Sequence, residues 1–186
     1  MRDNFTFRKK NQLKKFDKSI KGNWDEKIIE LCKKINTLDN YYTTSSCSGR
    51  ILLIKKSSEK KDNLFIKVWH NNIDFKNLKE ELKKINSNEL IYFKQDPVIV
   101  HVGCRDLKDA QGFIDIAVKK AGWKRCGILS FGKRIIVELN STEKLEFPIF
   151  YNKILVDDNF LKLITKEANL KLKLGWSKIE RLIKLL

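Results

Sequence analysis

Apolar residues recur at three- and four-residue spacing in four stretches of the chain, which places them on one face of an α-helix. This pattern predicts helices over 24–38, 75–85, 107–121 and 157–186. Asn23 or Asp25 can cap the first helix, and Asp106 can cap the third, which Gly122 then ends. The last helix is the longest, and we expect a bend in it at Gly175.

Short apolar runs between these helices predict strands. The strands are expected over 51–54, 64–69, within 89–102, and over 126–131, 135–139 and 147–151. The strand within 89–102 is expected to be interrupted near Asp96-Pro97, with residues 98–100 as a core run. Pro97 marks a strand start or an edge, because proline has no amide donor for a sheet. Residues 126–139 are expected to form a hairpin that turns at Gly132. Residues 42–50 are expected to be a loop leading into the first strand.

This order of elements predicts an α+β fold, with a mixed sheet, helices packed on it and a long C-terminal helix. A helix followed by two strands occurs twice, near Cys47 and near Cys126, which suggests an internal αββ duplication. The glycine fingerprint of a dinucleotide-binding strand and helix is missing, so the sequence gives no support for a Rossmann-type methyltransferase. No proline- or glycine-rich linker divides the chain, and we expect one domain over 1–186. Residues 1–15 are expected to form a basic arm or a short helix.

The net positive charge of the chain indicates which kind of partner it can bind. The chain has 186 residues with 39 Lys+Arg against 23 Asp+Glu, a formal net charge of +16. Such a field attracts polyanions, and nucleic acid is the first candidate. Only seven of the basic residues are arginines, and three of them, Arg50, Arg105 and Arg125, lie within compact motifs. A hydrophobic content of 42% excludes a disordered basic tail.

The sequence contains no signal for a membrane span, a signal peptide, a metal site or a nucleophile motif. No apolar run approaches the roughly 18 residues that span a bilayer, and no signal peptide is visible. The four cysteines form no CxxC pair, and there are two histidines and no HExxH. We therefore expect no metal site and four reduced thiols. A GxSxG nucleophile motif is also missing.

Three short segments are candidates for chemistry. In the segment 43–50, TTSSCSGR, hydroxyl and thiol residues precede Gly49 and Arg50, so the segment offers hydrogen-bond donors and an anion ligand. In the segment 101–106, HVGCRD, an extended strand would place His101, Gly103 and Arg105 on one side. Trp69 and His70 combine an aromatic surface with a titratable imidazole.

These segments resemble the tRNA wybutosine-synthesizing protein 3 family in its archaeal form. The resemblance rests on four motifs and covers roughly residues 13–186. The motifs are Asp17-x-Ser19-x-Lys21-Gly22-x-x-Asp25, the segment 43–50, the segment HVxCRxLxDAQ at 101–111, and AGWxxCG at 121–127.

The resemblance implies an S-adenosylmethionine-dependent N-methyltransferase with a fold that is not of the Rossmann type. Members methylate N4 of the tricyclic, guanosine-derived base at position 37 of phenylalanine tRNA. We therefore expect a cytoplasmic enzyme of wybutosine biosynthesis, acting as a monomer on the anticodon loop of tRNA, without a metal or a membrane.

Methyl transfer to nitrogen needs an in-line geometry and an acceptor for one proton. His101, His70 or Asp25 can be that base, and Asp109 is a rival. For the cofactor we expect Ser45, Ser46, Gly49, Arg50, Arg105 and Asp109. For the substrate we expect Lys21, Trp69, Trp123 and Arg125.

Two other functions agree with parts of the sequence. A non-catalytic RNA-binding protein would need only the basic surface and the aromatic residues. A hydrolase, or another tRNA-modifying enzyme, would use the Ser-Ser-Cys segment together with His101.

Overall fold

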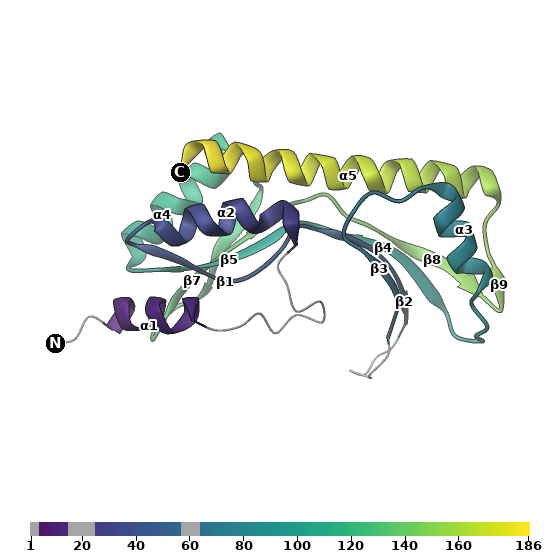
Figure 1. Cartoon of the computed structure of the whole chain (residues 1–186), viewed down its shortest axis with the longest axis horizontal. Helices are drawn as coiled ribbons and strands as arrows, with labels where there is room; N and C mark the ends of the chain where they lie inside the picture. Colours follow the sequence, from purple (N-terminus) through teal and green to yellow (C-terminus); the bar gives the residue numbers. More distant parts are fainter. Residues whose placement is uncertain (1–3, 15–24, 57–63) are drawn as a thin grey trace. The chain divides into compact units, whose positions relative to one another are not determined.

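The computed structural model describes residues 4–14, 25–56 and 64–186, and they divide into two compact units (Figure 1). The first unit comprises Met1–Ser48, Val98–Thr142 and Gly175–Leu186. The second unit comprises Gly49–Pro97 and Glu143–Leu174. The long helix α5 (Asp158–Leu185) contributes its beginning to the second unit and its end to the first.

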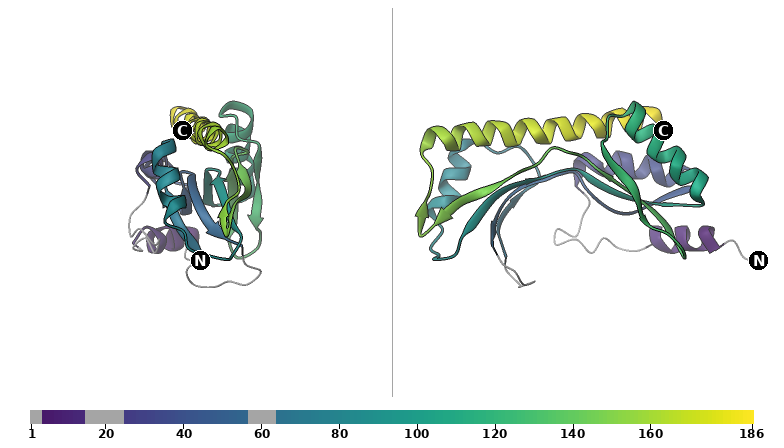
Figure 2. Two further views of the ribbon diagram at one scale, coloured as in Figure 1. Left: turned by 90° about the vertical axis from the view of Figure 1, so that its right-hand side faces the viewer. Right: turned by 180° about the vertical axis from the view of Figure 1, so that it is seen from behind.

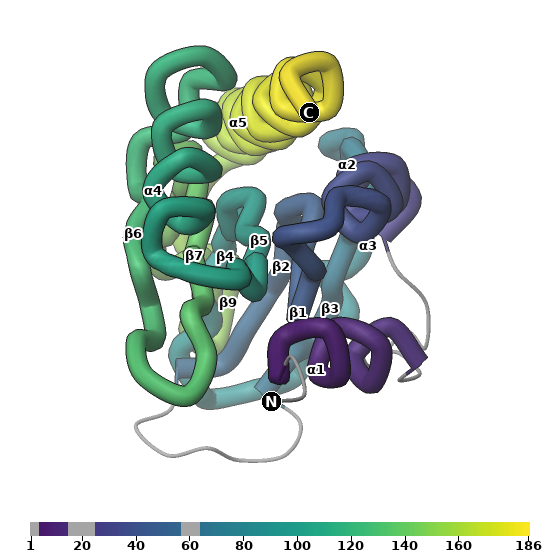
Figure 3. Tube along the Cα trace, turned by 90° about the vertical axis from the view of Figure 1, so that its left-hand side faces the viewer, coloured from purple at the N-terminus to yellow at the C-terminus, as the bar shows by residue number. Residues whose placement is uncertain are grey.

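The first unit is built on a four-stranded antiparallel sheet in the order β1-β5-β7-β6. Its strands are β1 (Tyr41–Cys47), β5 (Ile99–Cys104), β6 (Arg125–Ser130) and β7 (Ile135–Asn140). The helices α2 (Glu26–Thr37) and α4 (Leu107–Asp115), the π-helix η1 (Ile116–Lys120) and the end of α5 cover one face (Figure 3). The short helix α1 (Asn4–Leu13) lies on the other side, against β1.

The core of the first unit lies between the sheet and its helices. Alternate residues of β5 and β7 point into it, and they are Val100, Val102, Val137 and Leu139. Because side chains alternate along a strand, the residues between them point to the opposite face of the sheet. That second face, called the open face here, carries His101 and Glu138.

The second unit is built on a five-stranded antiparallel sheet in the order β3-β2-β4-β8-β9. Its strands are β2 (Arg50–Lys55), β3 (Phe65–Trp69), β4 (Ile91–Asp96), β8 (Leu145–Tyr151) and β9 (Lys153–Ile154). The helix α3 (Phe75–Lys83) and the beginning of α5 pack on one side of this sheet (Figure 2). The side chain of Asn169 on α5 binds the segment just before α3, since its Oδ1 accepts from the Ile73 amide at 3.0 Å and its Nδ2 donates to the Ile73 carbonyl at 2.7 Å.

The predicted α+β fold, the long C-terminal helix and the absence of a Rossmann arrangement are confirmed. The predicted mixed sheet is wrong, because every strand pair in the described residues is antiparallel. The pairing also does not repeat an αββ unit: β6 and β7 form a hairpin, whereas β1 and β2 belong to different sheets. The single domain over 1–186 stays a prediction.

Local structure differs from the sequence prediction mainly in the segment 42–50. Most of it is strand β1, which pairs with β5 from Tyr41 opposite Cys104 to Cys47 opposite Ile99. Residues 4–13 form the short helix that was one of the two expectations for the N-terminus. No helix in the described part of the chain has the length and apolar composition that crossing a bilayer requires.

Candidate active site

Three polar side chains from three adjacent strands form a row on the open face. The strand register places Ser45 of β1 opposite His101 of β5, and His101 opposite Glu138 of β7. Ser45 Oγ lies 2.6 Å from His101 Nδ1, and His101 Nε2 lies 2.8 Å from Glu138 Oε2. The two distances link a hydroxyl, an imidazole and a carboxylate in a continuous hydrogen-bonded chain.

The chemistry of the partners assigns the proton positions in this row. An ionised carboxylate only accepts hydrogen bonds, so a neutral His101 donates from Nε2 to Glu138. Nδ1 then has a free lone pair and accepts from the hydroxyl of Ser45. Ser45 itself is exposed to solvent. The row can therefore take up a proton at its exposed end and hold it on the imidazole.

Ser46 lies on the other face of the sheet from Ser45. Its Oγ accepts a hydrogen bond from the thiol of Cys32 on α2 at 3.4 Å. Burial raises the pKa of that thiol to about 11, although Ser46 and Thr43 partly offset the effect. A strand turns successive side chains to opposite faces, so the two serines do not point to the same side of β1. The binding of the cofactor by Ser45 and Ser46 stays a prediction.

Two residues of β6 extend the open face beyond Glu138. Gly127 lies opposite Glu138, and Arg125 lies opposite Asn140. A Cβ atom placed on Gly127 would meet nothing within 4 Å, so the space next to Glu138 is open. The exposed Arg125 lies on the same face, where a phosphate or another anion could reach it.

Aromatic side chains cover the end of this face towards α1. The ring of Tyr42 lies directly over Gly103, and Phe5 of α1 packs against Tyr42 with ring centroids 5.3 Å apart. The guanidinium of Arg105 lies 4.8 Å from the centroid of Phe5. Gly103 is thus the point on β5 where a side chain would leave no room for the tyrosine.

Arg105 and Asp109 are linked through a third residue, Asn40. Arg105 Nε donates to Asn40 Oδ1 at 2.8 Å, and Asn40 Nδ2 donates to Asp109 Oδ1 at 3.0 Å. Tyr41 also donates from its hydroxyl to the Asp109 carbonyl, and burial raises its pKa to about 12. These contacts join the start of α4 to the turn before β1. Their role as cofactor ligands stays a prediction.

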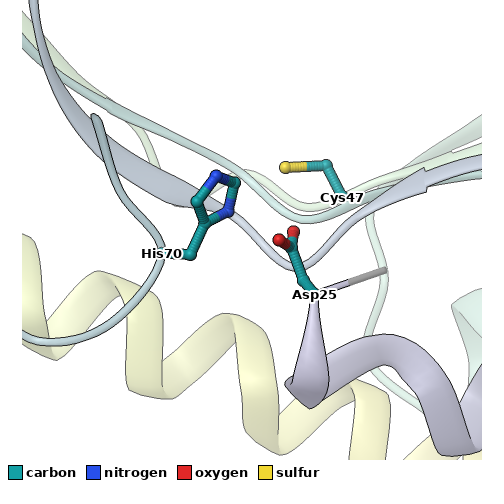
Figure 4. A group of neighbouring side chains, drawn as sticks. All are labelled: Asp25, Cys47 and His70. Carbon is teal, nitrogen blue, oxygen red and sulfur yellow. The ribbon is translucent and has the colours of Figure 1, made fainter. Parts of the chain in front are cut away.

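A second polar cluster of the first unit surrounds Asp25, which precedes α2. Its carboxylate makes no capping bond to its own helix. It accepts instead from the Ser48 amide at 3.1 Å and from the Ser48 hydroxyl at 3.2 Å, while the Trp176 indole donates to the Ser48 carbonyl at 3.0 Å. A carboxylate oxygen of Asp25 lies within 4.8 Å of Cys47 Sγ (Figure 4). Asp25 thereby holds the end of β1.

The second unit contains the remaining motif residues. Arg50 Nε donates to Asp96 Oδ2 at 2.9 Å, and its guanidinium lies 5.2 Å from the ring centroid of Phe65. A ligand carboxylate would have to compete with Asp96 for Arg50. Gly49 has a φ of +85°, and a Cβ there would lie 3.1 Å from the Asp96 carbonyl oxygen, so this turn requires glycine. Trp69 ends β3, and His70 follows it.

Trp123 is not a substrate-binding residue. Its side chain is 0% exposed and belongs to the core of the first unit. A buried ring has no face for a nucleobase, so this prediction was wrong. Lys21, with Asp17, Ser19 and Gly22 of the same motif, lies outside the described residues.

Sequence reasoning missed Glu138, Ser48 and Trp176. A signal for Glu138 was available in the strand 135–139, since Ile135, Val137 and Leu139 alternate with it. The alternation places Glu138 on the face away from the core, but its partner His101 emerges only from the pairing of β5 with β7.

Comparison with protein families gives one match over almost the whole chain. The family model described as "Methyltransferase TYW3" matches residues 7–186.

Several archaeal proteins are similar to this chain over most of its length. A protein of Pyrococcus furiosus, tRNA(Phe) 7-((3-amino-3-carboxypropyl)-4-demethylwyosine(37)-N(4))-methyltransferase 1, is 36% identical over 185 residues, covering 97% of this chain and 93% of its own. A Methanocaldococcus jannaschii protein with the same name, without the final numeral, is 34% identical, covering 89% of this chain and 88% of its own. The solved structure of the PH1069 protein from Pyrococcus horikoshii superposes with a TM-score of 0.86 at 33% identity, covering 99% of this chain and 96% of that one.

Proposed function

This chain belongs to the methyltransferase TYW3 family, and we propose that it uses S-adenosylmethionine to methylate N4 of the demethylwyosine-type base at position 37 of phenylalanine tRNA. The names of the archaeal relatives support the base, the atom and the tRNA. The net charge of +16 supports a polyanionic substrate. We place the reaction in the cytoplasm, with its tRNA.

The observation that carries the mechanism is the row formed by Ser45, His101 and Glu138. S-adenosylmethionine, when bound, supplies an electrophilic methyl group on a positively charged sulfur. The nitrogen that gains the methyl group loses one proton, which must leave the site. Ser45 Oγ accepts that proton while its own proton passes to His101 Nδ1 over 2.6 Å. Glu138 holds the ring through Nε2.

The balance of this step is complete. A nitrogen–carbon bond forms, the carbon–sulfur bond breaks, and the positive charge that leaves the sulfur is replaced by the proton on the imidazole. No oxidant or reductant is involved. His70 and Asp25 stay alternative bases under the same balance.

The carboxylate of Asp25 is suited to accept hydrogen bonds from the polar groups of S-adenosylmethionine. That molecule carries ribose hydroxyls and an ammonium group, which are hydrogen-bond donors. The Asp25 carboxylate is held by the amide and hydroxyl of Ser48 and faces away from its own helix, so it is a fixed acceptor for such donors. We therefore assign Asp25 to binding of the methyl donor, with Cys47 beside it.

Titration calorimetry separates this function from a non-catalytic RNA-binding protein. The proposal predicts heat from S-adenosylmethionine binding to the protein alone or to its complex with tRNA. A protein that binds tRNA but gives no heat with the donor in either state is an RNA-binding module, and the proposal fails.

The same row also supports a second candidate, an acyl hydrolase with Ser45 as nucleophile. A serine activated by an imidazole that a carboxylate orients is the arrangement such enzymes use. A fluorophosphonate probe tests this directly. Labelling of Ser45 that is lost in His101→Gln supports the hydrolase. A protein that the probe does not label argues against the hydrolase and in favour of the methyltransferase.

A further inference from the structure

The first unit contains a cavity of about 270 Å³ between α1 and the turn that joins β6 to β7. Figure 3 shows α1 and this turn at the same, lower end of the view. Residues from both elements and from the strands between them line the cavity, among them Phe5, Arg8, Tyr42, Arg105, Lys133 and Arg134.

Positive charge is concentrated in this cavity. Three of the seven arginines of the chain line it, together with Lys133. The described residues that line it include no aspartate or glutamate. Because most basic residues of this protein are lysines, a cluster of three arginines is not a consequence of composition. Guanidinium groups give the planar, bidentate contacts that phosphate oxygens accept.

Contacts within the protein hold two of these arginines in place. Arg8 donates to the Lys133 carbonyl and, at 3.2 Å, to Asn4 Oδ1. Arg105 donates to Asn40 Oδ1 at 2.8 Å and lies over the ring of Phe5. The exposed side chain of Arg134 has no hydrogen bond or ion pair with other described residues. A guanidinium has five donors, so each of the three retains donors for a ligand.

The hairpin beside the cavity exposes large apolar side chains. Phe131 is 73% exposed and Leu129 is 60% exposed. An aromatic ring next to a cationic groove is the combination that binds single-stranded nucleic acid, because bases stack on the ring while cations follow the backbone. An inorganic anion or a protein carboxylate would make no use of the ring.

The cavity opens on the same face of the sheet as the proposed base. Tyr42 lines the cavity and lies over Gly103, which is two residues from His101 on β5. Two residues along a strand correspond to roughly 7 Å. An RNA strand bound in the cavity would therefore pass close to the row of Ser45, His101 and Glu138.

We propose that the cavity binds a backbone phosphate of an unpaired RNA strand through Arg8, Arg105 and Arg134, and that Phe131 stacks on a neighbouring base. This proposal rests on the proposed function, because it takes the bound RNA to be the tRNA substrate. It adds a defined anchoring site that is separate from the groups that handle the proton.

Binding of a fluorescently labelled anticodon stem-loop, measured by anisotropy over a series of salt concentrations without methyl donor, tests the site. Arg134→Gln and the double variant Arg8→Gln/Arg134→Gln are compared with Arg181→Gln, which removes the same charge from an exposed position on α5. We expect the double variant to bind at least about tenfold more weakly, because each lost charge-assisted hydrogen bond is worth about that factor or more. Its slope of log affinity against log salt should become shallower by up to about 0.7, the value for one phosphate contact on a single strand.

Two further variants make the result specific. Phe131→Ala should weaken binding at every salt concentration without changing the slope, because stacking releases no counterions. Arg181→Gln should leave both affinity and slope close to those of the parent. Circular dichroism shows whether the loss of Arg8 unfolds α1. If it does, the single variant Arg134→Gln replaces the double variant in the comparison.

Other outcomes overturn the proposal. Parental affinity and slope in Arg134→Gln and in a folded double variant would show that RNA does not use this cavity. Millimolar phosphate or adenosine monophosphate that raises the melting temperature of the parent, with no change of RNA affinity in these variants, would assign the cavity to a free anion or nucleotide. The binding assay contains no methyl donor, so its result does not depend on methyl transfer. The RNA-binding proposal and the proposed methyltransferase function can therefore fail independently.

Discussion

Ser45 Oγ and His101 Nδ1 lie 2.6 Å apart, although 56 positions separate the two residues in the chain. The pairing of β1 with β5 brings them together, and a register shift between Thr43 and Ser45 sets which serine meets the histidine. Without that irregularity the alternation of side chains along β1 would be displaced relative to β5. The proposed proton path therefore depends on the sheet, not on neighbouring positions in the sequence.

Replacing His101 by glutamine should slow methyl transfer with little change in tRNA binding. A general base contributes roughly 10²–10⁴-fold to a rate, and loss within that range is expected. Ser45→Ala should also lower the rate, since the exposed end of the proton path is lost. Single-turnover rates on saturating tRNA measure this. Undiminished transfer by His101→Gln would remove this residue from the mechanism and leave His70 or Asp25.

Glu138 is a positioning residue, and Glu138→Gln should change the protonation pattern of the His101 ring. The carboxylate only accepts, whereas an amide can also donate, so the ring loses the partner that keeps its proton on Nε2. Nitrogen NMR of labelled histidine reports which ring nitrogen carries the proton. We expect one tautomer in the parent, a mixture in the variant, and a lower rate. An unchanged tautomer with a lower rate would mean that Glu138 acts in another way.

Asp25→Asn should weaken binding of S-adenosylmethionine. The amide removes the negative charge, and its NH₂ group replaces one acceptor, so we expect an affinity loss of about tenfold or more. Calorimetry with the donor measures it, and Asp115→Asn on the surface of α4 is the matched control. Equal affinities in the parent and in Asp25→Asn would place the donor elsewhere and return Asp25 to the list of bases.

Two glycines of the open face should respond oppositely to alanine. A Cβ on Gly103 would lie 2.5 Å from Tyr42 Cζ, so Gly103→Ala must displace the buried tyrosine, at a cost of roughly 1–3 kcal/mol of unfolding free energy. A Cβ on Gly127 meets nothing within 4 Å, so Gly127→Ala should leave stability equal or slightly higher. Urea denaturation of both variants measures the difference. Equal stabilities would contradict this packing of Tyr42.

The cysteines should differ in reactivity. Burial raises the pKa of Cys32 to about 11 and that of Cys104 to about 12. A raised pKa lowers the thiolate population, so at pH 8 these thiols are about 0.1% ionised or less. Iodoacetamide at pH 8, followed by peptide mass spectrometry, should modify the partly exposed Cys47 well before either of them. Rapid labelling of Cys32 in the folded protein would contradict its burial on the core side of α2.

Periodicity predicted those parts of the fold where apolar spacing is regular. The helices α2 and α5 and the hairpin of β6 and β7 were predicted close to their observed bounds. The segment 43–50 was predicted as a loop, because its threonines and serines show no apolar alternation. It forms a strand because β5 supplies its hydrogen bonds, and that tertiary contact leaves no trace in local composition.

The candidate site was predicted in part, for the same reason. The histidine, Ser45 and Arg125 could be selected from motifs, and the structure gathers them on one face. Glu138 could not be selected, since its significance comes from lying opposite His101. Trp123 was misassigned because an aromatic residue in a motif is equally compatible with a stacking surface and with a core position, and its burial decides between them.

The most direct measurement is methyl transfer to tRNA that lacks this methylation, read by nucleoside mass spectrometry. The purified protein is incubated with phenylalanine tRNA carrying the unmethylated tricyclic base and with S-adenosylmethionine bearing a deuterated methyl group. We predict one labelled methyl group on that base and a strongly reduced yield with His101→Gln at equal tRNA occupancy. An intact parent protein that binds this tRNA and the donor yet leaves the base unchanged would contradict the account.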